Sequence, residues 1–501
     1  MMEGQLLTYS LSVPYIVGFI QLLINKKASG KVHAIMSSVA LLIPAAASII
    51  AFGLYSTYLS YPLPIVGLGY FMLFIDGLNW PVVAGIALVT VLIAIYSYPY
   101  MEARFHELGS EDWGIYYFLY VYFSVSLLGI VLSNNFILFY LFLEVSLITS
   151  FLLIALYGYG NRQRISIIYL IWTHLGGFLF LVGSFIYGLT LHTFNFYPPP
   201  LPSGFILQAL GPLAAVVATL IVLGMFIKMA VFGVHMWLPY AHAEAPTPVS
   251  ALLSPVMIGI GGYAIIRITY VIFEPLLLKA QMVLLALSVV TIIYGGLMAL
   301  KENDFKRLLA YSSIAQMGYM LMGIATLSPI GILGALLQFF AHAVGKSILF
   351  SSAGVLISKN DNLRDINKMG GLAKSMPYTS SLALLGFMDI SGLPPTIGFF
   401  SKLLILIAVG VELVKLGLSG MILLAFVLLG FGLTPAYAFY AMKRIFFGPP
   451  KIKGIEANKT MLVPMILIAV VGIITFAFPS MIVNSVSGVL HTMFVIGGVI
   501  V

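Results

Sequence analysis

Apolar stretches long enough to cross a membrane recur along the whole chain, separated by short polar connections. A helix rises ~1.5 Å per residue, so about 20 residues cross a hydrocarbon core of ~30 Å. The pattern predicts an all-α polytopic membrane protein with fourteen spans. These lie near residues 6–24, 32–54, 75–98, 113–132, 134–157, 164–190, 205–235, 248–273, 280–300, 308–326, 330–357, 377–410, 420–442 and 460–479. The apolar tail 480–501 is expected either to form a further short helix or to pack on the surface.

The distribution of basic residues supports this count of spans. Eighteen of the 24 lysines and arginines fall in one set of alternate connections, whereas the other set holds only Lys279 and Lys415. Cytoplasmic loops carry an excess of Lys and Arg, so the asymmetry predicts a cell-membrane protein with both termini on the outer side. The eighteen are Lys26, Lys27, Lys31, Arg104, Arg162, Arg164, Lys301, Lys306, Arg307, Lys359, Arg364, Lys368, Lys374, Lys443, Arg444, Lys451, Lys453 and Lys459.

The composition excludes several classes of protein. Of the 501 residues 61% are hydrophobic and 8% are charged, whereas soluble domains carry roughly 25% charged residues. The chain has no cysteine, which excludes disulfides, thiolate metal sites and haem attached through cysteine. No residues resemble a metal cluster, a phosphate loop or a nucleophile with its base, so we expect no cofactor and no metal in this chain. The net charge of +8 follows membrane topology and does not indicate nucleic-acid binding.

The stretch KMAVFGVHMWLPYAHAEAPTPVSALLS, from Lys228 to Ser254, is the centre of the predicted chemistry, and it includes His242. Lys228 has about ten apolar or small residues on either side, and a charge at membrane depth costs several kcal/mol unless it is paired or hydrated. The alternative is a lysine that extends to the nearest interface. The span 205–235 is ~45 Å of ideal helix, which requires tilt or a break, and transporters place such breaks at their ion sites.

Three further ionisable residues lie in earlier spans. Glu144 is about ten residues into its span, ~15 Å deep and near the midplane, where a carboxylate must be neutral, paired or hydrated. The alternative for Glu144 is a structural hydrogen bond to a neighbouring helix. His174, in THLGG, serves either function or packing. Asp76 opens the third span and is expected to cap it near the outer interface.

The second half of the chain contains a similar set of polar residues. His342 and Lys346 are four residues apart and share a helix face, as expected either of a step in a proton relay or of a satisfied core pair. The sequence GLPP, residues 392–395, predicts a second broken helix. Asp389 lies just before this break and Lys402 about two turns after it.

Charged and polar residues also gather at the start of the tenth span. We expect the charged ones to form a solvated loop on the inner side of the membrane, where basic residues collect. A polar stripe continues from them into the helix. The charged residues are Lys301, Asp304, Lys306 and Arg307, and the stripe consists of Ser312, Ser313 and Gln316.

Acid, lysine and histidine side chains in different spans suit proton hopping through a hydrated belt. When the Glu144 carboxylate moves away, the desolvated Lys228 amine is expected to release its proton. We hypothesise that this proton passes along the histidines and leaves through Lys402. The candidate relay consists of Glu144, Lys228, His242, His342, Lys346, Lys402 and Asp389.

Five stretches resemble the antiporter-like subunits shared by respiratory complex I, Mrp-type cation/proton antiporters and membrane-bound hydrogenases. They are FLEVSLI around Glu144, K-x₇-MWLPYAHAEAPTPVSALLS from Lys228, DFKRLLAYSSIAQMGY, HAVGKSILF and GLPPTIGFFSK. With the predicted spans they cover the fourth to the thirteenth. The length resembles that of the shorter members, including the Mrp D-type subunit.

The resemblance implies two inverted five-helix repeats, each with a broken helix, around a central polar axis. It also implies that Glu144 and Lys228 form the input pair and that Lys402 is the terminal lysine. The implied domains are helices one to three in 1–110, the first repeat in 111–275, the second repeat in 276–445, and the last helix with the tail in 446–501.

The chain departs from the family pattern at two positions. The family usually has a lysine in the eighth span, about where Gly259 stands, so a bridge between the halves must use His242, His342, Lys346 or water. Asp389 stands before GLPP, where an uncharged residue is usual.

Three functions follow from this resemblance. The first is an ion-pumping subunit of a redox-driven complex, such as a hydrogenase or a dehydrogenase. In that complex the redox centres belong to other chains, and the partners are other antiporter-like and small hydrophobic subunits. The second is a D-type subunit of a non-redox Na⁺/H⁺ antiporter, in which Asp389 and Glu144 are candidate sodium ligands. The third is a structural scaffold, which the cost of the buried charges disfavours.

Overall fold

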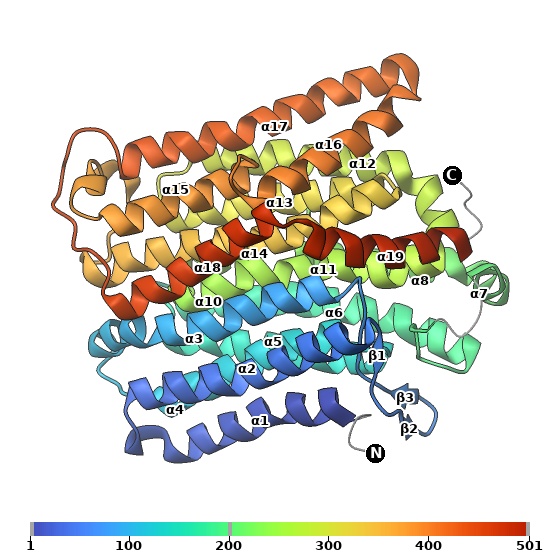
Figure 1. Cartoon of the computed structure of the whole chain (residues 1–501), viewed down its shortest axis with the longest axis horizontal. Helices are drawn as coiled ribbons and strands as arrows, with labels where there is room; N and C mark the ends of the chain where they lie inside the picture. The colour runs from blue at the N-terminus through green and yellow to red at the C-terminus, as the bar shows by residue number, and fades with distance from the viewer. Residues whose placement is uncertain (1–4, 199–202, 497–501) are drawn as a thin grey trace.

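The computed structural model describes residues 5–198 and 203–496, and these are almost entirely helical (Figure 1). The helices of the first half are α1 Leu6–Ile24, η2 Asn25–Lys27, α2 Gly30–Tyr55, α3 Trp80–Leu108, α4 Trp113–Leu132, α5 Phe136–Tyr157, α6 Arg162–Leu191, α7 Ser203–Leu210, α8 Leu213–Met229, α9 Trp237–Glu244, α10 Thr247–Leu252, η3 Leu253–Met257, α11 Ile258–Ala264 and η4 Ile265–Tyr270. Those of the second half are α12 Val271–Lys301, α13 Phe305–Ala325, α14 Pro329–Lys359, η5 Ile366–Lys368, η6 Leu372–Lys374, α15 Pro377–Ser391, α16 Ile397–Val414, α17 Gly417–Ile445, α18 Lys459–Ala477 and α19 Ser480–Ile496. The all-α polytopic prediction is confirmed, and the described part of the tail forms the short helix α19.

The count of spans depends on one long helix. By length and apolar composition the described residues contain 12 candidate spans, or 13 when the bent pair α7 and α8 is counted as one. One of the 12 is a 55-residue run, Thr247–Lys301. At ~1.5 Å per residue it is more than twice as long as a ~30 Å core is thick, and its helix is interrupted at Phe273 (φ −120°, ψ 24°). Counting this run as two spans, and the bent pair α7 and α8 as one, gives the predicted fourteen.

Both predicted helix breaks are present. α7 and α8 meet at an angle of 108°, and α8 ends one residue after Lys228, where Ala230 takes the left-handed conformation (φ 54°). α15 ends at Ser391 with Gly392 in the left-handed conformation (φ 74°), which a glycine adopts without strain, and α16 begins at Ile397. Each break leaves backbone groups outside a helix beside a lysine.

The connection between α2 and α3 contains β-strands, which were not predicted from the sequence. It forms two small antiparallel sheets at one end of the bundle (Figure 1). The hydrophobic run through this connection is too short to be a span, and its Gly67 and Gly69, both at positive φ, allow a tight reversal. The strands are β1 Tyr58–Leu59 paired with β4 Phe74–Ile75, and β2 Leu63–Ile65 paired with β3 Gly69–Phe71.

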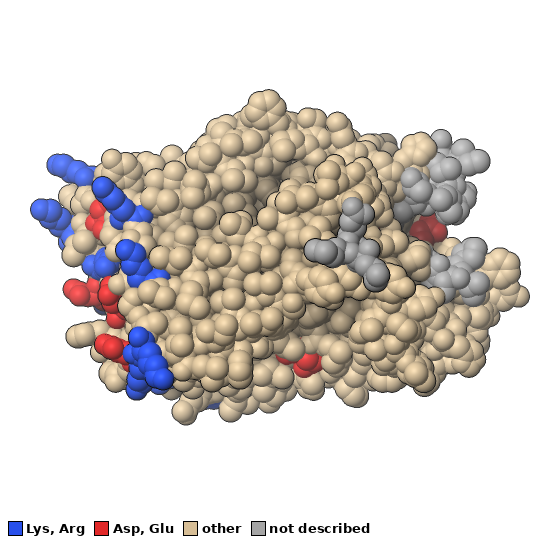
Figure 2. All heavy atoms as spheres, turned by 60° about the horizontal axis from the view of Figure 1, so that its bottom comes forward, with Lys and Arg blue, Asp and Glu red and all other residues tan. Residues whose placement is uncertain are grey.

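Basic side chains gather at the opposite end of the molecule from these strands, on the left in Figure 2. We call this the basic end. It carries the connections from α1 to α2, from α3 to α4 and from α17 to α18 (Figure 1). Large apolar side chains cover the flanks, whereas α13 and α14 lie in the interior with their apolar windows fully buried. The second half therefore offers a shielded centre for polar side chains.

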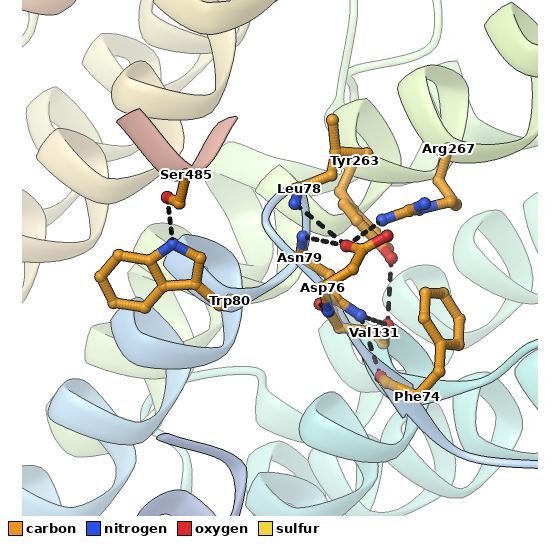
Figure 3. Close-up of polar contacts among 9 residues, drawn as sticks. All are labelled: Phe74, Asp76, Leu78, Asn79, Trp80, Val131, Tyr263, Arg267 and Ser485. Atoms are coloured by element: carbon orange, nitrogen blue, oxygen red, sulfur yellow. Dashed lines mark hydrogen bonds and ion pairs between the residues drawn. The ribbon is translucent and has the colours of Figure 1, made fainter. Parts of the chain in front are cut away.

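A buried ion pair ties the strand-bearing connection to the long helix (Figure 3). Asp76 lies 2.5 Å from an Nη atom of Arg267, and both side chains are at most 2% exposed. Asp76 also accepts backbone N–H groups of Leu78 and Asn79 at 3.0 and 3.1 Å, in the turn that precedes α3. The N-cap of α3 is Asn79, so the expectation that Asp76 caps this helix is wrong: it orders the preceding turn instead. The guanidinium lies 4.8 Å from the centre of the Tyr197 ring. This pair is far from both helix breaks along the chain and fixes the packing of this end.

Candidate functional site

Lys228 lies at the C-terminal end of α8, immediately before the first break. Its side chain is buried, and its amine has no hydrogen-bond partner in the described part of the chain. The adjoining cavity is lined by Leu143, Ser146, Met225 and mostly apolar neighbours. The cavity offers about 10 Å³ to the centre of a water molecule, which is roughly what one water needs. An unpaired amine in such surroundings strongly favours gaining a partner or losing its proton.

Glu144 on α5 supplies the carboxylate whose charge acts on Lys228. One of its oxygens lies 3.1 Å from Nδ1 of His174 on α6, and the other is buried without a partner. Gly177, also on α6, allows this approach, since a Cβ there would lie 2.5 Å from the free oxygen. The His174 side chain is 54% exposed, so this pair reaches the flank of the molecule. The charge of the predicted acid thus acts on the predicted lysine without an ion pair between them, and His174 is the partner of Glu144.

Lys402 follows the second break, and its amine is held on two sides. It donates to Oε1 of Gln316 at 2.8 Å and lies 4.6 Å from the centre of the Tyr319 ring. The same Gln316 oxygen accepts from Gln338 at 2.9 Å, and Ser401 donates to Gln338 at 2.6 Å. All of these side chains are buried. The predicted polar stripe at Gln316 therefore does reach the terminal lysine.

Asp389 occupies the last turn of α15, directly across the second break from α16. One oxygen accepts the backbone N–H of Gly398 at 2.9 Å, and the other is buried without a partner. A Cβ at Gly345 on α14 would lie 2.7 Å from this free oxygen, so α14 covers it closely. The charges of Asp389 and Lys402 act on each other. The structure therefore pairs an acid with the second lysine on a single broken helix.

His342 and Lys346 share the inward face of α14, as their spacing predicts. Nδ1 of His342 lies 3.3 Å from the carbonyl oxygen of Pro255, in the π-helical turn η3, and its Nε2 has no described partner. The Lys346 amine donates to the Leu309 carbonyl at 2.7 Å and to the Ser312 hydroxyl on α13. α14 therefore joins the long helix to α13 through polar contacts at its core.

His242 and Lys306 belong to the same buried cluster. His242 is fully buried on α9, and neither ring nitrogen has a partner in the part of the chain that the structure describes; the charges of Lys306 and Lys346 act on it. Lys306 is also fully buried and donates to the carbonyl of Ala245. The expectation that Lys306 lies in a solvated loop is wrong, because α13 begins one residue earlier and carries it inward; of that group only Lys301 is exposed.

The position of the lysine that the family usually carries in the eighth span is filled by an aromatic ring. A Cβ at Gly259 would lie 2.5 Å from Cδ2 of Phe339 on α14. The carbonyl of Pro255, one turn before Gly259, is where His342 contacts the long helix. The polar contact between the halves therefore lies one helical turn from the expected place and uses His342.

The arrangement falls into two groups. Glu144, His174 and Lys228 form one group around the first break, and the larger group surrounds the second. The larger group consists of His242, Lys306, His342, Lys346, Lys402, Asp389, Gln316, Gln338 and Ser401. The described residues hold no set of three or more His, Asp or Glu side chains that could bind a metal ion. Amines, imidazoles and carboxyls placed in this way can pass protons.

Sequence reasoning missed Gln338 and Ser401 and misjudged Lys306. Gln338, His342 and Lys346 follow one another at intervals of four residues, which places all three on one helix face. That periodicity was a usable signal for Gln338. The burial of Lys306 had no local signal, because it depends on the end of α9 lying against the start of α13.

Comparisons with known proteins show a family that this chain matches and relatives with similar sequences. Residues 133–434 match the family described as NADH:quinone oxidoreductase/Mrp antiporter, TM. The chain is 33% identical over 376 residues to NAD(P)H-quinone oxidoreductase chain 4 1 of a Synechococcus species, covering 75% of this chain and 69% of that one. It is 32% identical over 394 residues to F(420)H(2) dehydrogenase subunit M of Methanosarcina mazei, covering 74% of each.

Solved structures share the fold. A chain of respiratory complex I from Thermus thermophilus superposes with a TM-score of 0.83 at 23% identity, covering 98% of this chain and 99% of that one. A chain of the Mrp complex from a Dietzia species gives 0.82 at 20% identity, covering 97% and 96%. A chain of an archaeal membrane-bound sulfane sulfur reductase gives 0.80 at 24% identity, covering 94% and 75%.

Proposed function

This chain belongs to the NADH:quinone oxidoreductase/Mrp antiporter family, and from that premise we propose that it translocates protons as a membrane subunit of a multisubunit, energy-converting redox complex. The relatives at 32–33% identity are named as subunits of quinone- and F(420)H(2)-dependent oxidoreductases. The redox centres would lie on other chains. Its partners would be other antiporter-like and small hydrophobic membrane subunits.

The observation that carries the proposal is the unpartnered amine of Lys228, buried at a helix break under the charge of Glu144. A nearby carboxylate favours the ammonium form of a buried lysine, and its withdrawal favours the neutral amine. Movement of Glu144 therefore makes Lys228 release a proton, and its return makes Lys228 take one up. This alternation is the elementary step of a pump.

The proton released in the first half is passed to the second through the polar contact at Pro255 and His342, with water filling the gap. His342 and Lys346 share one helix face, and the charges of Lys346 and Lys402 act on His342. Lys402 then releases the proton under the control of Asp389. The residues that carry the relay are Glu144, Lys228, His242, His342, Lys346, Lys402 and Asp389.

The orientation and the division of the chain belong to the same proposal. The concentration of basic side chains at one end supports a cytoplasmic basic end, with both termini on the outer side of the cell membrane. The two breaks, each beside a lysine and an acid, support two five-helix repeats of inverted topology. We assign them to residues 111–275 and 276–445, with helices one to three in 1–110 and the last helix and tail in 446–501.

A second candidate is a D-type subunit of a non-redox Na⁺/H⁺ antiporter. The family description includes Mrp antiporters, and the fold of a chain of an Mrp complex matches over nearly the whole length. Such a subunit would consume an ion gradient, whereas a redox complex builds one. Sodium would need clustered oxygen ligands, for which Glu144 and Asp389 are the acidic candidates.

Purification of the native complex, followed by reconstitution into vesicles with a pH-sensitive dye, tests the proposal. Co-purifying redox subunits and acidification or alkalinisation of the lumen on addition of an electron donor are the expected results. Small hydrophobic partners alone, with proton movement only in response to a sodium gradient, would establish the antiporter instead. A chain that moves protons under neither driving force would be a scaffold.

A further inference from the structure

Lys306 is a buried charge that the relay described above does not require. Its side chain is 0% exposed although it sits in the second position of α13, at the basic end. The charges that act on it are those of Arg364, Asp304, Glu244 and Arg104. A lysine buried among both cations and acids is costly to keep charged. Its position therefore needs an explanation.

An open hollow of about 470 Å³ lies on the surface beside the start of α13. Its lining includes Asp304, Asp361 and Asp365 together with Arg364 and Lys368. Asp304 and Arg364 form an ion pair at 2.7 Å in its wall. The hollow is large and polar enough to hold many waters, and its wall includes two of the charges that act on Lys306. Solvent in the hollow therefore reaches Asp304 and Arg364, whose charges act on the buried amine, although Lys306 itself does not line the hollow.

Glu244, the last residue of α9, interacts electrostatically both with residues in the wall of the hollow and with Lys306. Arg364, Lys306 and Asp304 all act on its charge. One of its oxygens is buried without a partner and is covered by Gly160, where a Cβ would lie only 2.6 Å away. A half-buried carboxyl with a free oxygen can accept a proton from water and pass it inward.

The next polar groups toward the interior lie on successive turns of α9 and α13, which pack against each other. On the first turn, Lys306 donates to the carbonyl of Ala245 at the end of α9. Three residues further along each helix, ~4.5 Å away along its axis, lie His242 on α9 and Leu309 on α13. The carbonyl of Leu309 holds the amine of Lys346 at 2.7 Å. His242, with both ring nitrogens free, is under the charges of Lys306 and Lys346.

We propose that the hollow, Glu244, Lys306 and His242 form an inner port, through which protons from the basic end reach Lys346. The proposal rests on the proposed function and adds its supply route. A hydronium ion in the hollow protonates the Glu244 carboxylate and becomes water, and the carboxyl passes the proton to the neutral amine of Lys306. The resulting ammonium gives it to a free nitrogen of the His242 imidazole, and the imidazolium gives it to the neutral amine of Lys346. Each donor returns to its starting form, so no charge accumulates along the port.

The competing explanation is structural. By donating to the Ala245 carbonyl, Lys306 satisfies a backbone acceptor at the end of α9 and fixes the turn into α10. Arginine separates the two explanations because its guanidinium also donates to a carbonyl but does not release a proton. A purely structural Lys306 is replaced by arginine without loss, whereas a proton-carrying Lys306 is not.

The test compares Lys306→Arg with Lys301→Arg in the intact complex, reconstituted in vesicles and driven by its electron donor. Lys301 is exposed and five residues away at the same end, so its variant controls for the change of side chain. We expect Lys306→Arg to assemble and to lower the protons moved per electron about tenfold or more, with Lys301→Arg unchanged. Pumping by Lys306→Arg equal to wild type would overturn the port.

Glu244→Gln, which is isosteric, decides the case if Lys306→Arg does not assemble. The port predicts that this variant also pumps about tenfold more slowly, and wild-type pumping by Glu244→Gln contradicts it. Lys228→Ala in the same vesicles distinguishes failure of the inner port from failure of the proposed function. Loss of pumping in Lys228→Ala with normal pumping in the port variants would remove the port and leave the proposed function intact. A wild-type complex that moves no protons would remove the proposed function itself.

Discussion

At the first helix break the amine of Lys228 is buried without a hydrogen-bond partner among the described residues, whereas beyond the second break the amine of Lys402 donates to Gln316 and lies over the ring of Tyr319. The acids differ in the same way. Glu144 lies on α5, not on the helix of Lys228, and contacts the half-exposed His174 at the flank of the molecule. Asp389 lies on the same broken helix as Lys402 and is covered by α14.

This difference indicates how each half is controlled. Burial and the charge of Glu144 act on the Lys228 amine, which has no hydrogen bond in the described part of the chain, so its protonation responds to movement of Glu144. Because Glu144 reaches the flank through His174, a neighbouring subunit can cause that movement. Lys402 is held by a neutral amide and an aromatic ring as well as by its acid, so its proton is bound within the chain. The first half therefore suits reception of a signal, and the second suits retention and timed release.

The contrast between the two helix breaks assumes that the charges there serve transport and not stability. The buried pair of Asp76 and Arg267, which lies far from both breaks along the chain, tests this assumption. Asp76→Asn leaves Arg267 buried without its counter-charge, which costs about 3–5 kcal/mol. We expect a clear fall in the Tm of the purified complex, with protons moved per electron unchanged in the complex that survives. The matched control is Glu412→Gln, which removes an exposed pair with Lys415 and should leave the Tm in place. Loss of coupling without loss of stability in Asp76→Asn would break the distinction.

Removal of the second lysine is expected to have the largest effect on transport. Lys402→Met keeps the volume of the side chain but leaves Gln316 and Asp389 without their cation. Loss of a required proton carrier predicts a fall in pumping of about 100-fold, measured as dye quenching per electron transferred. Vigorous pumping by this variant would mean that protons leave the second half by another route.

Removal of the second acid should have an intermediate effect. In Asp389→Asn the amide keeps the acceptor for the N–H of Gly398 but loses the charge that acts on Lys402. Because Gln316 and Tyr319 still hold the amine, we expect pumping to slow by about tenfold and not to stop. A loss as complete as in Lys402→Met would show that the amide and the ring contribute nothing, and the contrast between the breaks would fail.

The smallest expected effect comes from crowding the first acid. Gly177→Ala places a methyl group 2.5 Å from the present position of a Glu144 oxygen, so the carboxylate must shift. Pumping should change by about two- to fivefold, in line with the ~1 kcal/mol that a small displacement of a charged pair costs. Gly410→Ala on α16 is the control, since a Cβ there meets nothing within 4 Å. Equal behaviour of the two variants would show that Glu144 has room to spare.

The sequence was sufficient for the features that depend on local pattern. Span lengths, the asymmetry of basic loops, the two breaks at Lys228 and at GLPP, and the shared face of His342 and Lys346 all follow from periodicity and helix-breaking residues. The features it did not predict depend on contacts between distant segments. The strands between α2 and α3 need the pairing of residues 58–59 with 74–75, and the burial of Lys306 needs the end of α9. The filling of the Gly259 position by Phe339 is of the same kind.

The most direct test of the account is the number of protons moved per electron by complexes that carry Lys228→Arg or Lys228→Ala. Assembly is first verified by the presence of all partner chains, and electron transfer by consumption of the donor. The account predicts that both variants transfer electrons but lose proton movement, because arginine keeps the charge and does not release its proton. Unchanged proton movement in Lys228→Ala would contradict it and would leave the ion path on other residues or on other chains.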